Sequence, residues 1–250
     1  MGSITLRAAV RRILEEDDIR KALEKFNTIA GYEGTTPTTG PLGGTVEEPE
    51  DEEVIPMQRK GQMQVGLADL RRLLNEFPNA FEIGDIVLKQ NGVQWRLVDR
   101  KGDDYTIMST TAFTYAPFDR PSKQHPWGSN VWEDSQLRME LNTVWLEKLF
   151  DKDYGIIKTS YKGLGKLFLL SEEEAGFKQT EDTFDWFRGE DEDMLDEKRQ
   201  LLDLDGDEVS WWMRFPNPGY AHSVRGVHTD GSWNYHDACT GRGAVAACII

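Results

Sequence analysis

The side chains best suited to metal binding, catalysis or ligand binding are concentrated in the last part of the sequence. Three of the four His stand there, His222, His228 and His236, with the carboxylates Asp230 and Asp237 close by in the chain. Imidazole and carboxylate groups at such spacing could hold a transition metal. They could equally form hydrogen bonds and charge contacts to a bound ligand. The composition around them helps to decide between these two kinds of chemistry.

Residues 215–250 have an unusual composition. Lys, Glu, Gln and Met are absent from them, although these four types make up about a quarter of residues 1–214. Chance alone would give such an absence roughly once in ten thousand cases. A tightly turned β region favours Gly, Asn and Ser over long charged side chains, which explains part of the loss. It does not explain the enrichment in His and Tyr.

A mutational origin explains the composition better. Randomising the two adenines of an Asn codon yields Tyr, His, Asp, Ser, Thr, Gly, Arg and Cys, but never Lys, Glu, Gln, Met or Trp. We therefore predict a variable, ligand-binding region over residues 215–243, set in an apolar and Gly-rich frame whose buried scaffold includes Trp211, Trp212 and Trp233. The candidate variable positions are Tyr220, His222, Ser223, Gly226, His228, Asn234, Tyr235, His236, Asp237, Cys239, Thr240 and Arg242.

Motifs around this region resemble a known family. Residues 210–216 (Ser-Trp-Trp-Met-Arg-Phe-Pro), 229–233 (Thr-Asp-Gly-Ser-Trp) and 243–250 (Gly-Ala-Val-Ala-Ala-Cys-Ile-Ile) are similar to the variable proteins of diversity-generating retroelements. The likeness is to a C-type-lectin-like domain found in gut phages and bacteria. Less specific matches at 84–87, 95–98, 132–142 and 168–171 extend it over residues 82–250. Many relatives finish with an Arg-Pro-containing strand, whereas residues 244–248 read Ala-Val-Ala-Ala-Cys.

The resemblance implies a C-type-lectin fold that presents diversified side chains on a stable floor. Relatives include phage tail proteins that bind the host surface, and bacterial surface proteins. The expected partner is a host-cell surface receptor or another protein or glycan ligand, and the expected location is a phage tail or a cell surface. A structural protein that only decorates a virion or a surface is the alternative.

Two further kinds of chemistry compete with this hypothesis. Asp203, Asp205 and Asp207 alternate around a Gly, as in a calcium loop, but residues 209–211 supply no further ligands. An acidic turn before a strand is the other interpretation. The lectin fold also hosts formylglycine-generating oxidases, which use a Cys pair. Here Cys239 is a candidate variable position and Cys248 lies in an apolar strand, so we predict no enzyme and no cofactor.

The net charge and the hydropathy of the sequence argue against nucleic-acid binding, membrane association and secretion. The net charge is −15, from 29 basic and 44 acidic residues, and such a surface repels phosphate backbones and anionic lipids. No run of 18 apolar residues predicts a membrane span. The basic and acidic residues within the first 20 positions do not fit a signal peptide, so export by the general secretory route is not expected.

Three segments are expected along the chain. Residues 1–30 contain an amphipathic helix at 4–29, which we predict to self-associate as a homo-oligomer or to dock on a virion. Residues 31–62 are a Gly/Pro-rich and acidic linker. Residues 63–250 form the ligand-binding domain, which we expect to be α+β with helices segregated from short antiparallel strands.

Periodicity predicts the elements of this domain. Helices are expected over residues 66–77 and 131–150, and an antiparallel meander over 83–109 with a tight Asn91-Gly92 turn. Residues 167–170 read as a buried strand, and Ser171 as the cap of another short helix. Residues 178–208 read as a long surface loop with Trp186 and Phe187 as anchors, followed by short strands over 209–250.

Overall fold

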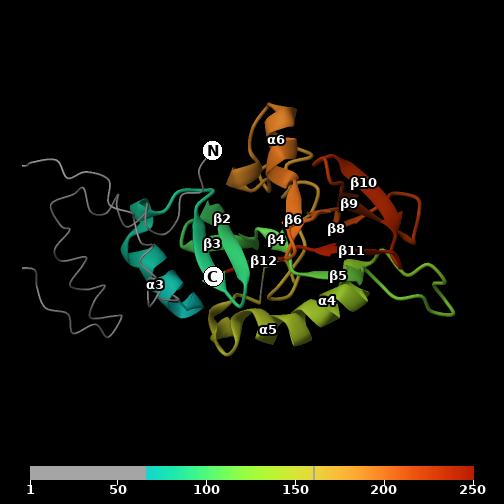
Figure 1. Ribbon diagram of the computed structural model, residues 1–250, viewed down its shortest axis with the longest axis horizontal. Coiled ribbons are helices and arrows are strands. Elements are labelled where there is room, and N and C mark those ends of the chain that lie inside the picture. Colours follow the sequence, from blue (N-terminus) through green and yellow to red (C-terminus); the bar gives the residue numbers. More distant parts are fainter. Residues whose placement is uncertain (1–65, 160) are drawn as a thin grey trace, which may run out of the picture. The chain divides into compact units, whose positions relative to one another are not determined.

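The computed structural model describes residues 66–159 and 161–250 (Figure 1). These residues form a mixed α+β domain with mostly antiparallel strands and few helices, which confirms the predicted fold class at that level. The predicted helix over residues 4–29 and the predicted linker over 31–62 lie outside the described residues. Among the described residues, no helix combines the length and apolar character that crossing a lipid bilayer requires.

The first predicted helix is confirmed as α3 (Leu67–Glu76). Its four buried residues, Leu67, Leu70, Leu73 and Leu74, form one stripe at three- and four-residue steps. The helix ends before Pro78, which begins the short 3-10 helix η1 (Pro78–Ala80).

The predicted meander is also confirmed. Strands β1 (Ile86–Gln90), β2 (Val93–Lys101) and β3 (Asp104–Ser109) pair in order, and β12 (Ala247–Ile249) joins β3 to complete a four-stranded sheet. The β1–β2 turn is Asn91-Gly92, where φ is 49° and 84°. A two-residue hairpin turn with both angles positive favours this sequence because Asn and Gly tolerate the left-handed region.

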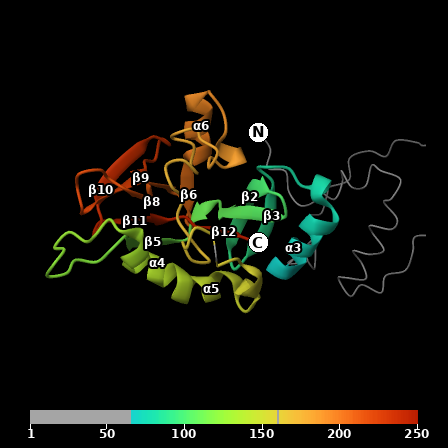
Figure 2. The ribbon, with the colours of Figure 1, turned by 180° about the vertical axis from the view of Figure 1, so that it is seen from behind.

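The predicted helix over residues 131–150 is broken into segments: η2 (Trp132–Asp134), α4 (Gln136–Glu140), the π-helical η3 (Leu141–Trp145) and α5 (Leu146–Phe150). Ser135 caps α4, since its side chain accepts a hydrogen bond from the backbone N–H of Arg138. Figure 2 shows α4 and α5 running along the same side of the domain as β5, as Figure 1 does. The short η4 (Asp153–Ile156) follows.

A five-stranded sheet carries the candidate variable region. Its strand order is β10-β9-β8-β11-β5, antiparallel except for the β8–β11 pair. The members are β5 (Thr114–Pro117), β8 (Trp211–Pro216), β9 (Ser223–Val227), β10 (Trp233–Asp237) and β11 (Gly241–Ala244). The short strands expected over residues 209–250 are thereby confirmed, and β10 is an edge strand.

The prediction of one long loop over residues 178–208 was wrong. This stretch contains η5 (Asp185–Phe187), α6 (Glu192–Arg199) and β6 (Leu201–Asp203). With β4 (Thr111–Ala112) and β7 (Glu208–Val209), β6 makes a three-stranded sheet. Helix α6 escapes a hydrophobicity pattern because its two buried residues are Leu195 and the cation Arg199.

The prediction for residues 167–174 was only partly right. Residues 167–170 are buried as expected, but the segment makes a single β-bridge, Phe168 to Ala247, instead of a strand. Ser171 does accept a hydrogen bond from the N–H of Glu174 at 3.2 Å, yet only a turn follows. Gly176, at a φ of 75°, adopts the left-handed backbone conformation at the end of this turn, so no helix forms.

Two buried tryptophans and one ion pair anchor strand β8 of the five-stranded sheet in the core. Trp211 and Trp212 are fully buried, and their indole N–H groups donate to the carbonyls of Arg199 and Ala116 at 2.9 and 3.0 Å. In the same strand, Arg214 donates to both carboxylate oxygens of the fully buried Glu174, at 2.5 and 2.6 Å. Both indole donors and both ionic partners are therefore satisfied inside the core.

Candidate ligand-binding site

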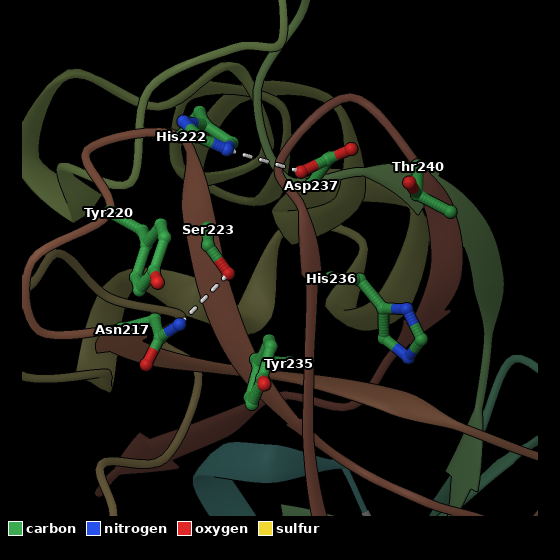
Figure 3. Close-up of a pocket in the computed structure, with 8 residues that line it drawn as sticks. All are labelled: Asn217, Tyr220, His222, Ser223, Tyr235, His236, Asp237 and Thr240. Atoms are coloured by element: carbon green, nitrogen blue, oxygen red, sulfur yellow. Dashed lines mark hydrogen bonds and ion pairs between the residues drawn. The ribbon is translucent and has the colours of Figure 1, made fainter.

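An open pocket of about 360 Å³ lies over the β9–β10 hairpin (Figure 3). Its walls come from the ends of β9 and β10 and from the loops that precede β9 and follow β10. The residues that line it are Asn217, Tyr220, His222, Ser223, Tyr235, His236, Asp237 and Thr240. All of them except Asn217 are candidate variable positions.

Strand register explains how these side chains meet. In the antiparallel β9–β10 pair, Asp237 stands opposite Ser223 and His236 opposite Val224. Directly opposed residues share a face of the sheet, and successive residues alternate between faces. Tyr235 and Asp237 therefore lie on one face of β10 and His236 on the other, and all three line the pocket at this edge of the sheet. Tyr220, before β9, is 58% exposed, and Tyr235 is 50% exposed.

Short polar contacts connect the walls. The His222 Nε2 atom lies 3.6 Å from Asp237 Oδ1, and the Asn217 amide donates to Ser223 Oγ at 3.3 Å (Figure 3). On the other side, the Arg242 guanidinium lies 2.9 Å from His236 Nδ1. These pairs are partly exposed, so they orient side chains more than they stabilise the fold.

His236 links the pocket to the core. Its ring meets the buried Trp212 edge-on, with 6.4 Å between the centroids and 77° between the planes. Burial lowers the pKa of His236, and the positive charge of Arg242 lowers it further. Both effects favour the neutral imidazole, which can donate one hydrogen bond and accept another.

The structure does not bring every candidate into the pocket. His228 lies at the far end of β9, where its Nδ1 is 3.4 Å from Asp230 Oδ1. Hydrogen bonds from Ser232 lower the pKa of Asp230, so that carboxylate stays ionised beside the ring. Asn234, Cys239 and Arg242 are also outside the lining, although each is partly exposed. The three His consequently do not form one cluster.

Two of the candidate variable positions, Ser223 and Gly226, are buried. Ser223 is 5% exposed, although it lines the pocket. Gly226 is buried in β9, and a Cβ atom there would lie 2.7 Å from the carbonyl oxygen of Trp211. That atom is backbone and cannot rotate away, so Gly226 belongs to the fixed frame.

The prediction that Trp233 is buried scaffold was wrong, whereas Trp211 and Trp212 are buried as predicted. Trp233 is 50% exposed, because it begins the edge strand β10. Its ring stacks on Tyr235, with 6.2 Å between the centroids, and the Arg225 guanidinium lies 4.9 Å from its centre. Trp233 thus supports the outer wall of the pocket instead of the core.

Sequence reasoning missed two residues next to the candidate positions. Asn217 lies in the same Lys-free segment and is itself an allowed codon product, so the composition could have indicated it. Tyr115 had no such signal. The pairing of β5 with β11 brings it to Arg242, whose guanidinium donates to the Tyr115 hydroxyl at 3.4 Å.

The calcium candidate is a hairpin turn between β6 and β7. One carboxylate oxygen of Asp203 accepts backbone hydrogen bonds from Asp205, Gly206 and Asp207 at 2.9, 3.0 and 3.0 Å. That oxygen is committed to the turn, as the acidic-turn interpretation requires. Across residues 66–159 and 161–250, no three His, Cys, Asp or Glu side chains come together as a metal site.

Fold and site together define an α+β domain whose C-terminal strands build a small, open, polar pocket. Residues 102–250 match the family model described as "Domain of unknown function (DUF6273)", and the chain belongs to that family. Neither the curated proteins nor the solved structures contain a match to this sequence.

Proposed function

We propose that this chain is a non-enzymatic ligand-binding protein with a C-type-lectin scaffold, a variable protein of a diversity-generating retroelement. One observation supports the proposal most strongly. Seven of the eight residues that line the pocket are positions whose types fit randomisation of an Asn codon. That set of twelve positions was defined from residue types alone, yet seven of its members line one pocket.

The arrangement separates recognition from stability. The scaffold residues Trp211 and Trp212 are fully buried, whereas Tyr220 and Tyr235 are about half exposed. Exchanging the exposed side chains therefore leaves the core contacts intact, and surface substitutions away from such contacts change stability little.

The side chains around the pocket suit ligand binding. Tyr220 and Tyr235 offer aromatic faces with a hydroxyl at the tip, and these rings lose little conformational entropy on binding. His222, Asp237 and Thr240 add hydrogen-bond donors and acceptors. We propose display in several copies on a phage tail or a cell surface, since multiple weak sites on one particle add avidity.

Sequencing tests the proposal directly. The coding segment for residues 215–243 should differ between sibling isolates at the codons of the pocket positions, with changes at adenines. A near-identical copy of this segment should lie beside a reverse-transcriptase gene. Substitutions spread evenly along the chain would contradict the proposal.

Replacing the pocket residues distinguishes a receptor-binding protein from a purely structural protein. The triple variant Tyr220→Ala, His222→Ala and Tyr235→Ala, at exposed side chains of the pocket, should lose attachment to the cells that the parent protein binds, while keeping its thermal unfolding midpoint. The matched control is Lys89→Ala, at an exposed residue of β1 in the other sheet. Unchanged attachment of the triple variant would favour a purely structural protein.

A further inference from the structure

A loop outside the variable region holds the loop between β8 and β9. Residues 119–130, here termed the clamp, end at Asn130. The Asn130 side-chain amide donates to the carbonyls of Tyr220 and Ser223 at 2.9 and 3.1 Å, and its backbone N–H donates to the carbonyl of Ala221 at 3.0 Å. One residue therefore fixes three carbonyl groups within residues 220–223, at the mouth of the pocket.

The clamp also holds the loop between β10 and β11. The carbonyl of Trp127 accepts the N–H of Cys239 at 3.0 Å, and the N–H of Asp119 donates to the carbonyl of Ala238 at 3.0 Å. Ala238 in turn donates its own N–H to the carbonyl of His222 at 2.7 Å. Both pocket loops are thus tied to the clamp and to each other.

The clamp has its own fixed geometry. The Asp119 carboxylate accepts the N–H of Ser129 at 2.9 Å and the N–H of Gln136 at 3.2 Å, which joins the clamp to helix α4. Gly128 has a φ of 79°, and a Cβ atom there would lie 2.8 Å from the carbonyl oxygen of Asp119 and 3.0 Å from the Ala238 side chain. The clamp therefore packs closely against the pocket loop.

All these contacts share one chemical property. Among the described residues, every hydrogen bond between the clamp and residues 220–239 ends on a main-chain atom of the pocket loops. Main-chain groups are the same whatever side chain the position carries. Substituting Tyr220 or His222 removes none of these bonds.

We infer that the clamp fixes the backbone of the two pocket loops independently of the side chains that they carry, and that Asn130 is its main positioning residue. The inference rests on the proposed function, because only a diversified site needs loops whose shape is independent of their sequence. It assigns a role to a segment that carries no candidate variable position.

Hydrogen exchange on the full chain tests the clamp without any ligand. Asn130→Asp is nearly isosteric but has no side-chain N–H to donate. We expect the amides of Ser223, Ala238 and Cys239 to exchange at least tenfold faster in this variant, while β2 and β3 exchange as in the parent. Lys123→Ala, at an exposed clamp residue, is the matched control and should change none of these rates.

Unchanged exchange at these three amides in Asn130→Asp would overturn the inference. If Asn130→Asp does not fold, the milder Asn130→Ser, which keeps the backbone bond to Ala221, replaces it. The same selective increase in amide exchange at Ser223, Ala238 and Cys239 is then expected. Unchanged exchange in Asn130→Ser would also overturn the inference.

A displayed library tests the consequence for diversity. Six pocket positions are randomised with the Asn-codon repertoire in the parent and in the Asn130→Asp background, and protease-resistant members are counted. We expect the resistant fraction to fall at least tenfold in the Asn130→Asp background. The positions are Tyr220, His222, Tyr235, His236, Asp237 and Thr240.

The outcomes separate the inference from the proposed function. Equal resistant fractions in the two backgrounds would overturn the clamp and leave the proposed function standing. A library that loses resistance already in the parent background would contradict the proposed function, and the exchange rates then decide the role of Asn130 by themselves.

Discussion

Gly226 gives the sharpest prediction, because it is the candidate variable position that the structure removes from the variable set. It lies in β9, between Trp212 of β8 and Asn234 of β10. A Cβ atom at this position would be 2.7 Å from the carbonyl oxygen of Trp211 and 3.8 Å from the Trp212 ring. Any side chain must therefore push β9 away from β8.

The expected cost follows from this contact. Overpacking a filled core costs about 1–3 kcal/mol, which we expect for Gly226→Ala. Gly226→Ser adds a hydroxyl in a buried strand, and a buried hydroxyl without a partner costs about 1–3 kcal/mol more. For a domain of this size each kcal/mol lowers the unfolding midpoint by roughly 2–4 °C. Thermal and urea unfolding of the full chain measure both variants.

Asn234→Ser is the matched control. Asn234 stands opposite Gly226 in the register, and Ser belongs to the same codon repertoire at both positions. Asn234 is partly exposed on the edge strand, so we expect its variant to stay within about 0.5 kcal/mol of the parent. Equal stability of Gly226→Ser and the parent would refute the reasoning, as would sibling sequences that carry many residue types at position 226.

Three further predictions concern the core and the titrating groups. Arg214→Met leaves the fully buried Glu174 carboxylate without its cation, which should lower the free energy of unfolding by about 3–5 kcal/mol in urea titrations, and a double variant with Glu174→Leu should recover part of the loss. The pKa of His236 is lowered in the folded protein, so the unfolded chain binds the proton more readily. The contribution of this residue to stability is therefore present above a pH of about 6.5. It is lost as the pH falls toward the lower pKa of the folded state. His236→Asn should accordingly lose less thermal stability than the parent between pH 7.5 and pH 5.5, and an equal loss would contradict the assignment. Complete burial raises the pKa of the Cys248 thiol, so a thiol reagent should label only the half-exposed Cys239 in the native protein and both thiols in urea; rapid native labelling of two thiols would contradict the burial.

Local signals were sufficient for the elements that depend on local interactions. The apolar stripe of α3 and the Asn91-Gly92 turn were predictable because helix period and turn geometry are set by neighbours in the chain. The sequence failed where long-range contacts decide. Helix α6 buries Arg199 against the carbonyl of Ala175 and acidic side chains of its own turns, an arrangement that no hydrophobic pattern reports.

The candidate site likewise has features that residue types predict and features that depend on long-range contacts. Seven residues of the pocket lining belong to the set that composition alone predicted, because that prediction used only residue types. It could not separate the buried Ser223 and Gly226 from the exposed Tyr235, since that depends on which strand lies at the edge of the sheet. For the same reason Trp233, a large apolar residue, was misassigned to the core.

The position of β11 has a consequence for faulty gene copies. This strand carries the last candidate variable position, Arg242, and it lies inside the five-stranded sheet between β8 and β5, while β12 pairs with β3 in the other sheet. A premature stop or a shifted reading frame within codons 220–240 deletes both strands. Such a product cannot complete either sheet, so under the proposed diversification such copying errors would yield unfolded chains, and only in-frame replacements would yield a folded domain.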